Sequence, residues 1–269
     1  MSLNPDMDLG RRFLSARPPP GRLLLCAVTG SHYYGFPSPD SDLDLKGIHL
    51  APADLFLGLS AAPETHDKLE VFEGTECDLT THEAQKALLL LLRGNGNMLE
   101  RIFSPLQLLE SRELEELRVL ARGSLSRRFF WHYQGFFRGI CREHETKGQR
   151  RGKSLLYAYR VALTGTHLLR TGEVVGSLPQ IAEAYGFPEA IALAEAKRAG
   201  AEKGSLSPEE DERHRAAWPR LMELLEKARE ASPLPEDPAN AADLSAWLAE
   251  TRKRELFASR ALPEAPGIG

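Results

Sequence analysis

The sequence lacks the features of a membrane-spanning, disulfide-rich or fibrous protein. Its longest purely apolar run, residues 87–92, covers six residues, whereas a helix that crosses a bilayer needs about 20. Three widely spaced cysteines predict reduced thiols, not a disulfide framework or a zinc site. Glycine and proline follow no triplet period, which excludes a collagen-like fibre. The first ten residues do not resemble a signal peptide, so we expect a cytoplasmic protein without a membrane partner.

Charge is distributed unevenly along a chain of 269 residues with ordinary globular composition. The formal net charge is −4. Residues 118–170 nevertheless hold 12 Lys and Arg against 2 Asp and Glu, and acidic residues dominate on both sides. A basic segment inside an acidic chain predicts either an anionic ligand or acidic neighbours in the fold.

Hydrophobic patterning predicts strands only in the first part of the chain. Short apolar runs bounded by Gly and Pro predict two buried strands and a hairpin. These segments are residues 22–29, residues 43–50, and the pair 69–72 and 77–80. Thr80 and Glu83 then form a capping-box pattern, which predicts a helix from Thr80 to about residue 93.

After residue 105 the strand patterns end and helical patterns take over. They cover residues 110–144, 153–171, 178–200, 208–230 and 238–258. We therefore expect an α+β protein in which a small mixed-sheet domain precedes a mostly helical C-terminal domain. The expected boundaries are 1–20 for a flexible lead-in, 21–105 for the sheet domain and 106–269 for the helical domain.

Two acidic residues stand two positions apart at the start of the second predicted strand. Asp42 and Asp44 point to one face, because strand side chains alternate. Neighbouring carboxylates repel unless a cation lies between them, and hard oxygen ligands suit Mg²⁺. An EF-hand starting at Asp40 is excluded, since Leu45 and Ala51 stand where Gly and Glu are required. A polar turn capped by Asp side chains is the alternative without a ligand.

With its surroundings, this pair resembles the nucleotidyltransferase superfamily typified by DNA polymerase beta. A hydrophobic strand ends at Gly30-Ser31, ten residues follow, and Asp42-x-Asp44 opens the next strand. Asp78 stands where the superfamily has a third acid. More narrowly, the chain is similar to predicted nucleotidyltransferases found beside RNA ligases. The similarity lies in the pattern Gly-Ser-x-x-Tyr-Gly-x-x-x-x-x-Ser-Asp-x-Asp-x-Lys-Gly. Residues 94–100 are also similar to a segment of this group, except that Gly96 stands where the group has Pro.

The resemblance implies Mg²⁺-dependent transfer of a nucleoside monophosphate from a nucleoside triphosphate to an acceptor hydroxyl, a reaction of the EC 2.7.7 type. RNA is one candidate acceptor. The resemblance also implies that Gly30 and Ser31 contact the triphosphate. Glu76 is the same-face competitor of Asp78, which we prefer for its spacing to the following helix. The residues implied to be catalytic and to hold two Mg²⁺ ions are Asp42, Asp44 and Asp78.

A row of polar residues follows one face of the predicted helix at 153–171. Its members are Lys153, Tyr157, Arg160, Thr164 and His167. The resemblance implies that Lys153 and Arg160 contact the nucleotide phosphates and that Tyr157 contacts the base or sugar. A solvated helix face is the alternative. The basic loop at 147–152 is a candidate for contacts with RNA or a triphosphate, and a solvated loop is the alternative.

Two other functions remain open at this point. One is nucleotide transfer to a protein side chain, as in antitoxin-like nucleotidyltransferases. The other is a catalytically silent nucleotide-binding module, against which the presence of three acids argues.

Overall fold

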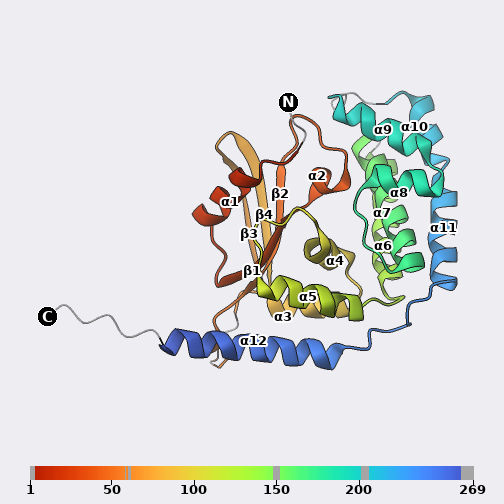
Figure 1. Cartoon of the computed structure of the whole chain (residues 1–269). Coiled ribbons are helices and arrows are strands. Elements are labelled where there is room, and N and C mark those ends of the chain that lie inside the picture. Colours follow the sequence, from red (N-terminus) through yellow and green to blue (C-terminus); the bar gives the residue numbers. More distant parts are fainter. Residues whose placement is uncertain (1–3, 58, 60–61, 148–151, 201–205, 262–269) are drawn as a thin grey trace.

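The computed structural model describes residues 4–57, 59, 62–147, 152–200 and 206–261, in which a mixed sheet and a group of helices lie side by side (Figure 1). The strands are β1 (Arg22–Val28), β2 (Leu43–Leu50), β3 (Thr65–Phe72) and β4 (Thr75–Glu83). The helices of the first half are α1 (Met7–Ala16), α2 (Gly30–Tyr34), the 3₁₀ turn η1 (Ala53–Phe56), α3 (Ala84–Leu92) and α4 (Gly96–Phe103). These bounds confirm the expected α+β class.

The sheet has the strand order β1-β2-β4-β3. β1 runs antiparallel to β2, and β2 runs parallel to β4. β3 and β4 form the predicted hairpin, which is longer than its apolar pattern indicated. The turn consists of Glu73 and Gly74, both with positive φ. The parallel β2–β4 pair at the centre matters for the site, because it brings together segments more than 30 residues apart.

The segment expected to be a flexible lead-in contains helix α1. Asp6 caps this helix by accepting a hydrogen bond from the Leu9 backbone N–H at 2.8 Å. Leu9 and Phe13 are buried in a cluster with β1 and β2 residues, including Val28 and Leu45. Burial of this apolar face against the sheet stabilises a helix that its polar composition did not predict.

The capping box predicted at Thr80 and Glu83 does not form. Thr80 lies inside β4, where it pairs with Lys46 of β2. Strand pairing keeps the backbone extended as far as Glu83, so α3 begins only at Ala84. Glu83 is itself the N-cap, and its carboxylate accepts from the Gln85 N–H at 2.7 Å.

The second half consists of helices packed around the long helix α7. Its elements are α5 (Arg112–Gly123), α6 (Phe129–Lys147), α7 (Gly152–Thr171), α8 (Leu178–Tyr185), α9 (Pro188–Arg198), α10 (Pro208–Arg215), α11 (Trp218–Glu230) and α12 (Ala241–Ala261). Three of the predicted helices are divided in two, at residues 124–128, 186–187 and 216–217. Gly186 at the second break has φ 72°, a left-handed conformation that ends α8. One buried core joins residues of the sheet half to those of the helical half.

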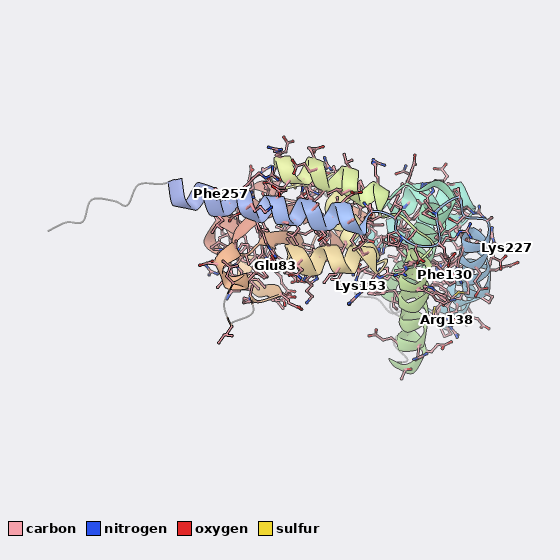
Figure 2. The ribbon with its side chains drawn as sticks, turned by 90° about the horizontal axis from the view of Figure 1, so that it is seen from below. Glu83, Phe130, Arg138, Lys153, Lys227 and Phe257 are labelled. Carbon is pink, nitrogen blue, oxygen red and sulfur yellow. The ribbon has the colours of Figure 1, made fainter. Side chains whose placement is uncertain are left out.

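Helix α12 returns to the sheet half, where it lies along α3 and α5 (Figure 2). Arg252 of α12 donates to the Glu83 carboxylate at 2.9 Å. Trp247 donates to Glu116 of α5 at 2.7 Å, and Glu255 pairs with Arg22 of β1 at 3.0 Å. The C-terminal helix thus covers the domain that carries the acids.

The structure also bears on the cysteines and on the length of the helices. The three cysteines are free thiols, with Cys26 and Cys77 buried and Cys141 partly exposed. Burial raises the pKa of Cys26 to about 12. Among the described helices, none has the length and apolar character needed to cross a membrane.

Candidate active site

The three predicted acids lie on one face of the sheet. Asp44 of β2 is directly paired with Asp78 of β4, and Asp42 immediately precedes β2. Glu76, the competitor of Asp78, is exposed and lies one same-face position earlier on β4. The register therefore makes Asp78 the partner of Asp44 across the parallel pair.

A lysine lies between two of these acids. Lys46 shares the face of Asp44 because it is two residues further along β2. Its Nζ donates to Asp78 Oδ2 at 2.6 Å and to Thr80 Oγ1 at 3.3 Å. The same Nζ is 3.9 Å from Asp44 Oδ1. Lys46 is therefore the counter-charge that links the carboxylates of β2 and β4.

Asp44 is in an environment that disfavours its charged form. Burial, followed by the negative charge of Asp42, raises the pKa of Asp44 from 3.8 to about 6. The negative charge of Asp78 adds to this rise, whereas the ammonium groups of Lys46 and Lys153 oppose it. Burial and the neighbouring acids together therefore favour the protonated form of the Asp44 carboxyl.

The predicted Gly-Ser turn packs directly on Asp44. Gly30 has φ 61°, and a Cβ at this position would lie 1.8 Å from Asp44 Oδ2. Thr29 donates its N–H to the Asp44 carbonyl at 2.9 Å. The Ser31 hydroxyl is buried and makes no hydrogen bond within the described residues. Glycine is needed at position 30 because the carboxylate of Asp44 occupies the space of a side chain.

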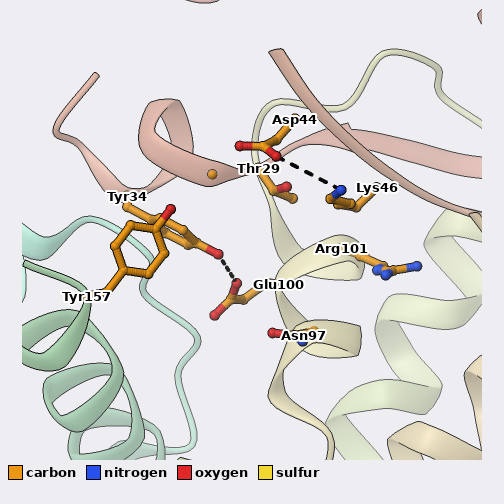
Figure 3. A pocket seen from close by; sticks show the side chains of 9 residues that line it. Thr29, Tyr34, Asp44, Lys46, Asn97, Glu100, Arg101 and Tyr157 are labelled. Atoms are coloured by element: carbon orange, nitrogen blue, oxygen red, sulfur yellow. Dashed lines mark hydrogen bonds and ion pairs between the residues drawn. The ribbon is translucent and has the colours of Figure 1, made fainter. Parts of the chain in front are cut away.

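A cavity of about 180 Å³ opens beside Asp44 (Figure 3). It lies where β2, α2, α4 and α7 meet, and both polar and aromatic side chains line it. The lining residues are Thr29, Gly30, Tyr34, Asp44, Lys46, Asn97, Glu100, Arg101 and Tyr157. Three of these, Gly30, Asp44 and Tyr157, are residues that the sequence singled out.

One wall of the cavity is a buried ion pair that joins the two halves of the chain. Glu100 of α4 is 2% exposed and accepts from Arg160 Nη1 at 2.5 Å. Tyr34 donates its hydroxyl to the other Glu100 oxygen at 2.8 Å. The Arg160 guanidinium stacks on the Tyr34 ring, 4.0 Å from its centroid.

The burial of Arg160 argues against the alternative in which this helix face is solvated, and its role in binding phosphate stays a prediction. Arg160 is 4% exposed, and in this structure its Nη1 binds Glu100. Burial lowers its pKa, but the negative charge of Glu100 and the three neighbouring tyrosines together more than offset that effect, and the pKa rises above its ordinary value. Arg160 is therefore a cation held at the back of the cavity.

Lys153 and Tyr157 of the same helix do lie near the acids. Lys153 is exposed, and its charge is among those that lower the pKa of Asp44. Figure 2 shows its position at the start of α7. Tyr157 lines the cavity and makes an edge contact with Tyr34 at a centroid distance of 5.8 Å. Burial raises the pKa of Tyr157 to about 12, so its hydroxyl stays protonated.

Arg101 forms the opposite side of the cavity. It is 6% exposed and donates from Nη1 to the Gly47 carbonyl at 3.0 Å. Its Nη2 lies 3.4 Å from His82 Nε2. Burial lowers the pKa of Arg101 to about 10, and burial together with the Arg101 charge lowers that of His82 to about 4. His82 is therefore neutral at pH 7 and can accept from the guanidinium.

The basic segment finds acidic neighbours within the fold. Arg127 and Arg128 lie close to Glu236 and Asp237, respectively, in the segment before α12. Arg138 lies 4.0 Å from Glu226 of α11. Exposed pairs of this kind contribute little stability, about 0–1 kcal/mol each. Residues 148–151, most of the predicted basic loop, lie outside the described residues.

Six residues of the cavity were not predicted to be functional, namely Thr29, Tyr34, Lys46, Asn97, Glu100 and Arg101. Lys46 stands in the Asp-x-Asp-x-Lys pattern, and its spacing of two from Asp44 placed it on the acidic face. Asn97 and Glu100 belong to the segment at 94–100, to which no role was assigned. Arg101 gave no signal, because an isolated basic residue in a helix is usually solvated.

A mixed sheet with paired acids beside a Gly-Ser turn, joined to a helical half, defines a nucleotidyltransferase of the DNA polymerase beta superfamily. The chain belongs to the RNA repair pathway DNA polymerase beta family, whose profile matches residues 12–250. This match covers both halves and confirms the family resemblance.

Two further similarities accompany the family match. The uncharacterized protein MJ0002 of Methanocaldococcus jannaschii is 27% identical over 150 residues, which are 56% of this chain and 61% of the relative. The chain thus matches about three fifths of that protein's length. The crystal structure of a nucleotidyltransferase-like protein from Exiguobacterium sibiricum aligns over 98% of this chain and 96% of the other, with 14% identity and a TM-score of 0.33.

Proposed function

We propose that the protein transfers a nucleoside monophosphate from a nucleoside triphosphate to an acceptor hydroxyl in a Mg²⁺-dependent reaction of the EC 2.7.7 type. The observation that carries this proposal is the registered Asp44–Asp78 pair, with Asp42 on the same face and Gly30 packed against Asp44. The acceptor oxygen would form a bond to the α-phosphorus, and the bond to the β-phosphate oxygen would break. Pyrophosphate leaves, and the acceptor loses its proton.

The donor chemistry of the acids fits a divalent cation. Asp42, Asp44 and Asp78 offer hard oxygen atoms, and burial together with the neighbouring acids disfavours the charged form of Asp44, which a bound cation would stabilise. Bound there, Mg²⁺ would neutralise charge on the phosphates and lower the pKa of the attacking hydroxyl. The described residues contain no cluster of three or more acidic, His or Cys side chains already arranged around one metal position. In this structure Asp78 is instead paired with Lys46.

The nucleotide-binding residues in this proposal are Gly30, Ser31, Lys153, Tyr157 and Arg160. The unpartnered Ser31 hydroxyl would donate to a phosphate oxygen. Lys153 would contribute a mobile positive charge from the start of α7. Tyr157 would bound the space for the sugar or base, while Arg160 would act on the nucleotide through Glu100 and Tyr34.

Two acceptor classes have support. The family description favours RNA. The sheet face beyond Asp78 favours a protein hydroxyl, because Leu69 opposite Asp78 and its neighbour Val71 are 66% and 69% exposed. Glu76 and Asp67 flank this apolar pair and carry negative charge. Such a surface attracts a neutral or basic polypeptide and repels a phosphate backbone.

A labelled-nucleotide assay tests the proposal. The protein is incubated with each α-labelled nucleoside triphosphate and Mg²⁺, alone, with total RNA, and with a protein extract. We expect label to enter one macromolecular fraction with wild-type protein and none with Asp44→Asn. Binding of nucleotide without any transfer would instead identify a catalytically silent module.

A further inference from the structure

The Lys46 ammonium occupies a specific position among the acids. It is 20% exposed, and its Nζ lies 2.6 Å from Asp78 Oδ2 and 3.9 Å from Asp44 Oδ1. Thr80 accepts a second hydrogen bond from it at 3.3 Å. Lys46 thus bridges the two central strands across the same carboxylates that the proposed metal would use.

Within the described part of the chain, no other Lys or Arg forms an ion pair with Asp44 or Asp78. Three carboxylates on one face would repel one another without this charge. A divalent cation and the ammonium cannot share the same lone pairs at full strength. The two cations therefore compete for Asp78.

We propose that Lys46 is a built-in counter-cation that holds Asp44 and Asp78 in the metal-free protein and releases Asp78 when a divalent cation binds. This inference rests on the proposed function, in that it takes these acids as metal ligands. It explains how a strained group of acids persists in a fold without metal. It also makes Lys46 a positioning residue, since it acts through Asp78.

The released ammonium would stay inside the cavity. Lys46 lines the same cavity as Gly30 and Tyr157, and its backbone is fixed within the β2–β4 pair. A positive charge freed there faces the space that the nucleotide phosphates would enter. Metal binding would therefore raise the affinity of the cavity for an anionic ligand by two routes, through the metal and through Lys46.

Metal titration without nucleotide tests this inference on the full chain. The variant is Lys46→Met, and the control is Lys68→Met on β3, which removes a sheet lysine paired with Glu70 on the opposite face. The readouts are Mg²⁺ and Mn²⁺ affinity by calorimetry and the melting temperature with and without metal. We expect Lys46→Met to melt lower than wild type without metal and to bind Mg²⁺ about tenfold more tightly, because a competing positive charge is gone. Lys68→Met should match wild type.

A charge-preserving variant separates competition from a purely structural role. Lys46→Arg presents a forked cation that pairs with a carboxylate more strongly. We expect this variant to bind Mg²⁺ more weakly than wild type, the opposite direction from Lys46→Met. If both variants weaken metal binding, or neither changes it, the inference is overturned. If Lys46→Met is unfolded at all Mg²⁺ concentrations, the Arg variant alone decides.

The outcome also separates this inference from the proposed function. Metal binding by wild type that the Lys46 variants leave unchanged overturns only the role of Lys46. Absence of any divalent-cation binding by wild type overturns both, since Lys46 then has no competitor.

Discussion

Gly30 and Asp44 are in direct contact, although 13 residues separate them in the chain. A Cβ at position 30 would lie only 1.8 Å from Asp44 Oδ2, so the Asp44 carboxylate occupies the space that a side chain would need. The first residue of α2 thereby restricts the position of the Asp44 carboxylate. The Asp44 carboxylate fills the space beside Gly30, and the same residue lines the cavity.

Gly30→Ala should therefore damage the site more than it damages the fold. The new methyl group must displace Asp44, and residue 30 must keep a left-handed φ, which costs about 1–2 kcal/mol. We expect unfolding free energy to fall by about 2–4 kcal/mol and Mg²⁺ affinity to fall at least tenfold.

Gly74→Ala is the matched control for this variant. Gly74 also has a positive φ, 86°, but nothing lies within 4 Å of its Cβ position. It should lose only the conformational term, about 1 kcal/mol, with unchanged metal affinity. If Gly30→Ala and Gly74→Ala bind Mg²⁺ equally well, the contact between Gly30 and Asp44 does not determine metal binding.

Asp44 should make the metal-free protein less stable as pH rises. Its pKa in the folded protein is about 6, above the ordinary 3.8, so the folded state binds this proton more tightly than the unfolded chain. The stabilisation is fully present below the ordinary value and is lost as pH rises through 6, by about 3 kcal/mol. Asp44→Asn removes this titration.

Denaturant unfolding of wild type and Asp44→Asn from pH 4 to 7, with a chelator present, measures the difference. The comparison is needed because His82 and His132, whose pKa values burial lowers to about 4, change stability in the opposite direction. Asp44→Asn should gain stability relative to wild type as pH rises. If the unfolding free energies of wild type and Asp44→Asn change with pH in the same way, the pKa of Asp44 is not raised in the folded protein.

Arg160 should contribute strongly to stability through Glu100. Arg160→Met leaves a carboxylate that is 2% exposed with the Tyr34 hydroxyl as its remaining partner. An uncompensated buried charge costs about 3–5 kcal/mol. Lys153→Ala, at an exposed position of the same helix, should cost less than about 0.5 kcal/mol.

The double variant Arg160→Met with Glu100→Gln should recover a large part of the lost stability, since it removes the orphaned charge. Chemical denaturation measures this, and calorimetry with a nucleoside triphosphate measures the remaining affinity. If Arg160 contacts the phosphates directly, the refolded double variant should bind the nucleoside triphosphate weakly. Near-normal binding would restrict Arg160 to holding the cavity wall.

Asn97 should affect ligand binding without affecting stability. Its side chain lines the cavity, whereas that of Asn95 caps α4 by accepting from the Asn97 N–H at 3.0 Å. Asn97→Ala should weaken nucleotide binding by about 0.5–1.5 kcal/mol, the range of one hydrogen bond. Asn95→Ala should instead lower unfolding free energy by about 1 kcal/mol. Unchanged nucleotide affinity in Asn97→Ala would remove Asn97 from the binding site.

Local patterns predicted the parts of this protein in which neighbours in sequence are neighbours in space. The strands β1 and β2 were found because short apolar runs between Gly and Pro have few alternatives. The common face of Asp42 and Asp44 followed from strand alternation alone.

Contacts between residues far apart in the sequence determined the features that local patterns did not predict. The helical repeat placed Arg160 on the face of Lys153, but Glu100, 60 residues earlier, draws it inward. The Thr80–Glu83 capping pattern was overridden by pairing with β2, which lies more than 30 residues away. Lys46 was visible in the pattern, yet its place between two carboxylates depends on the register of β4, which no local signal specifies.

The return of α12 to the sheet has a consequence for the order of folding during synthesis. Arg252 reaches Glu83 across 169 residues of chain, so the buried carboxylate of Glu83 lacks this partner until almost all of the described chain has been made. N-terminal segments usually fold first as a chain emerges from the ribosome. Here Glu83 of the sheet half lacks this counter-charge while the helical half is translated, and α12 completes the packing of the sheet half.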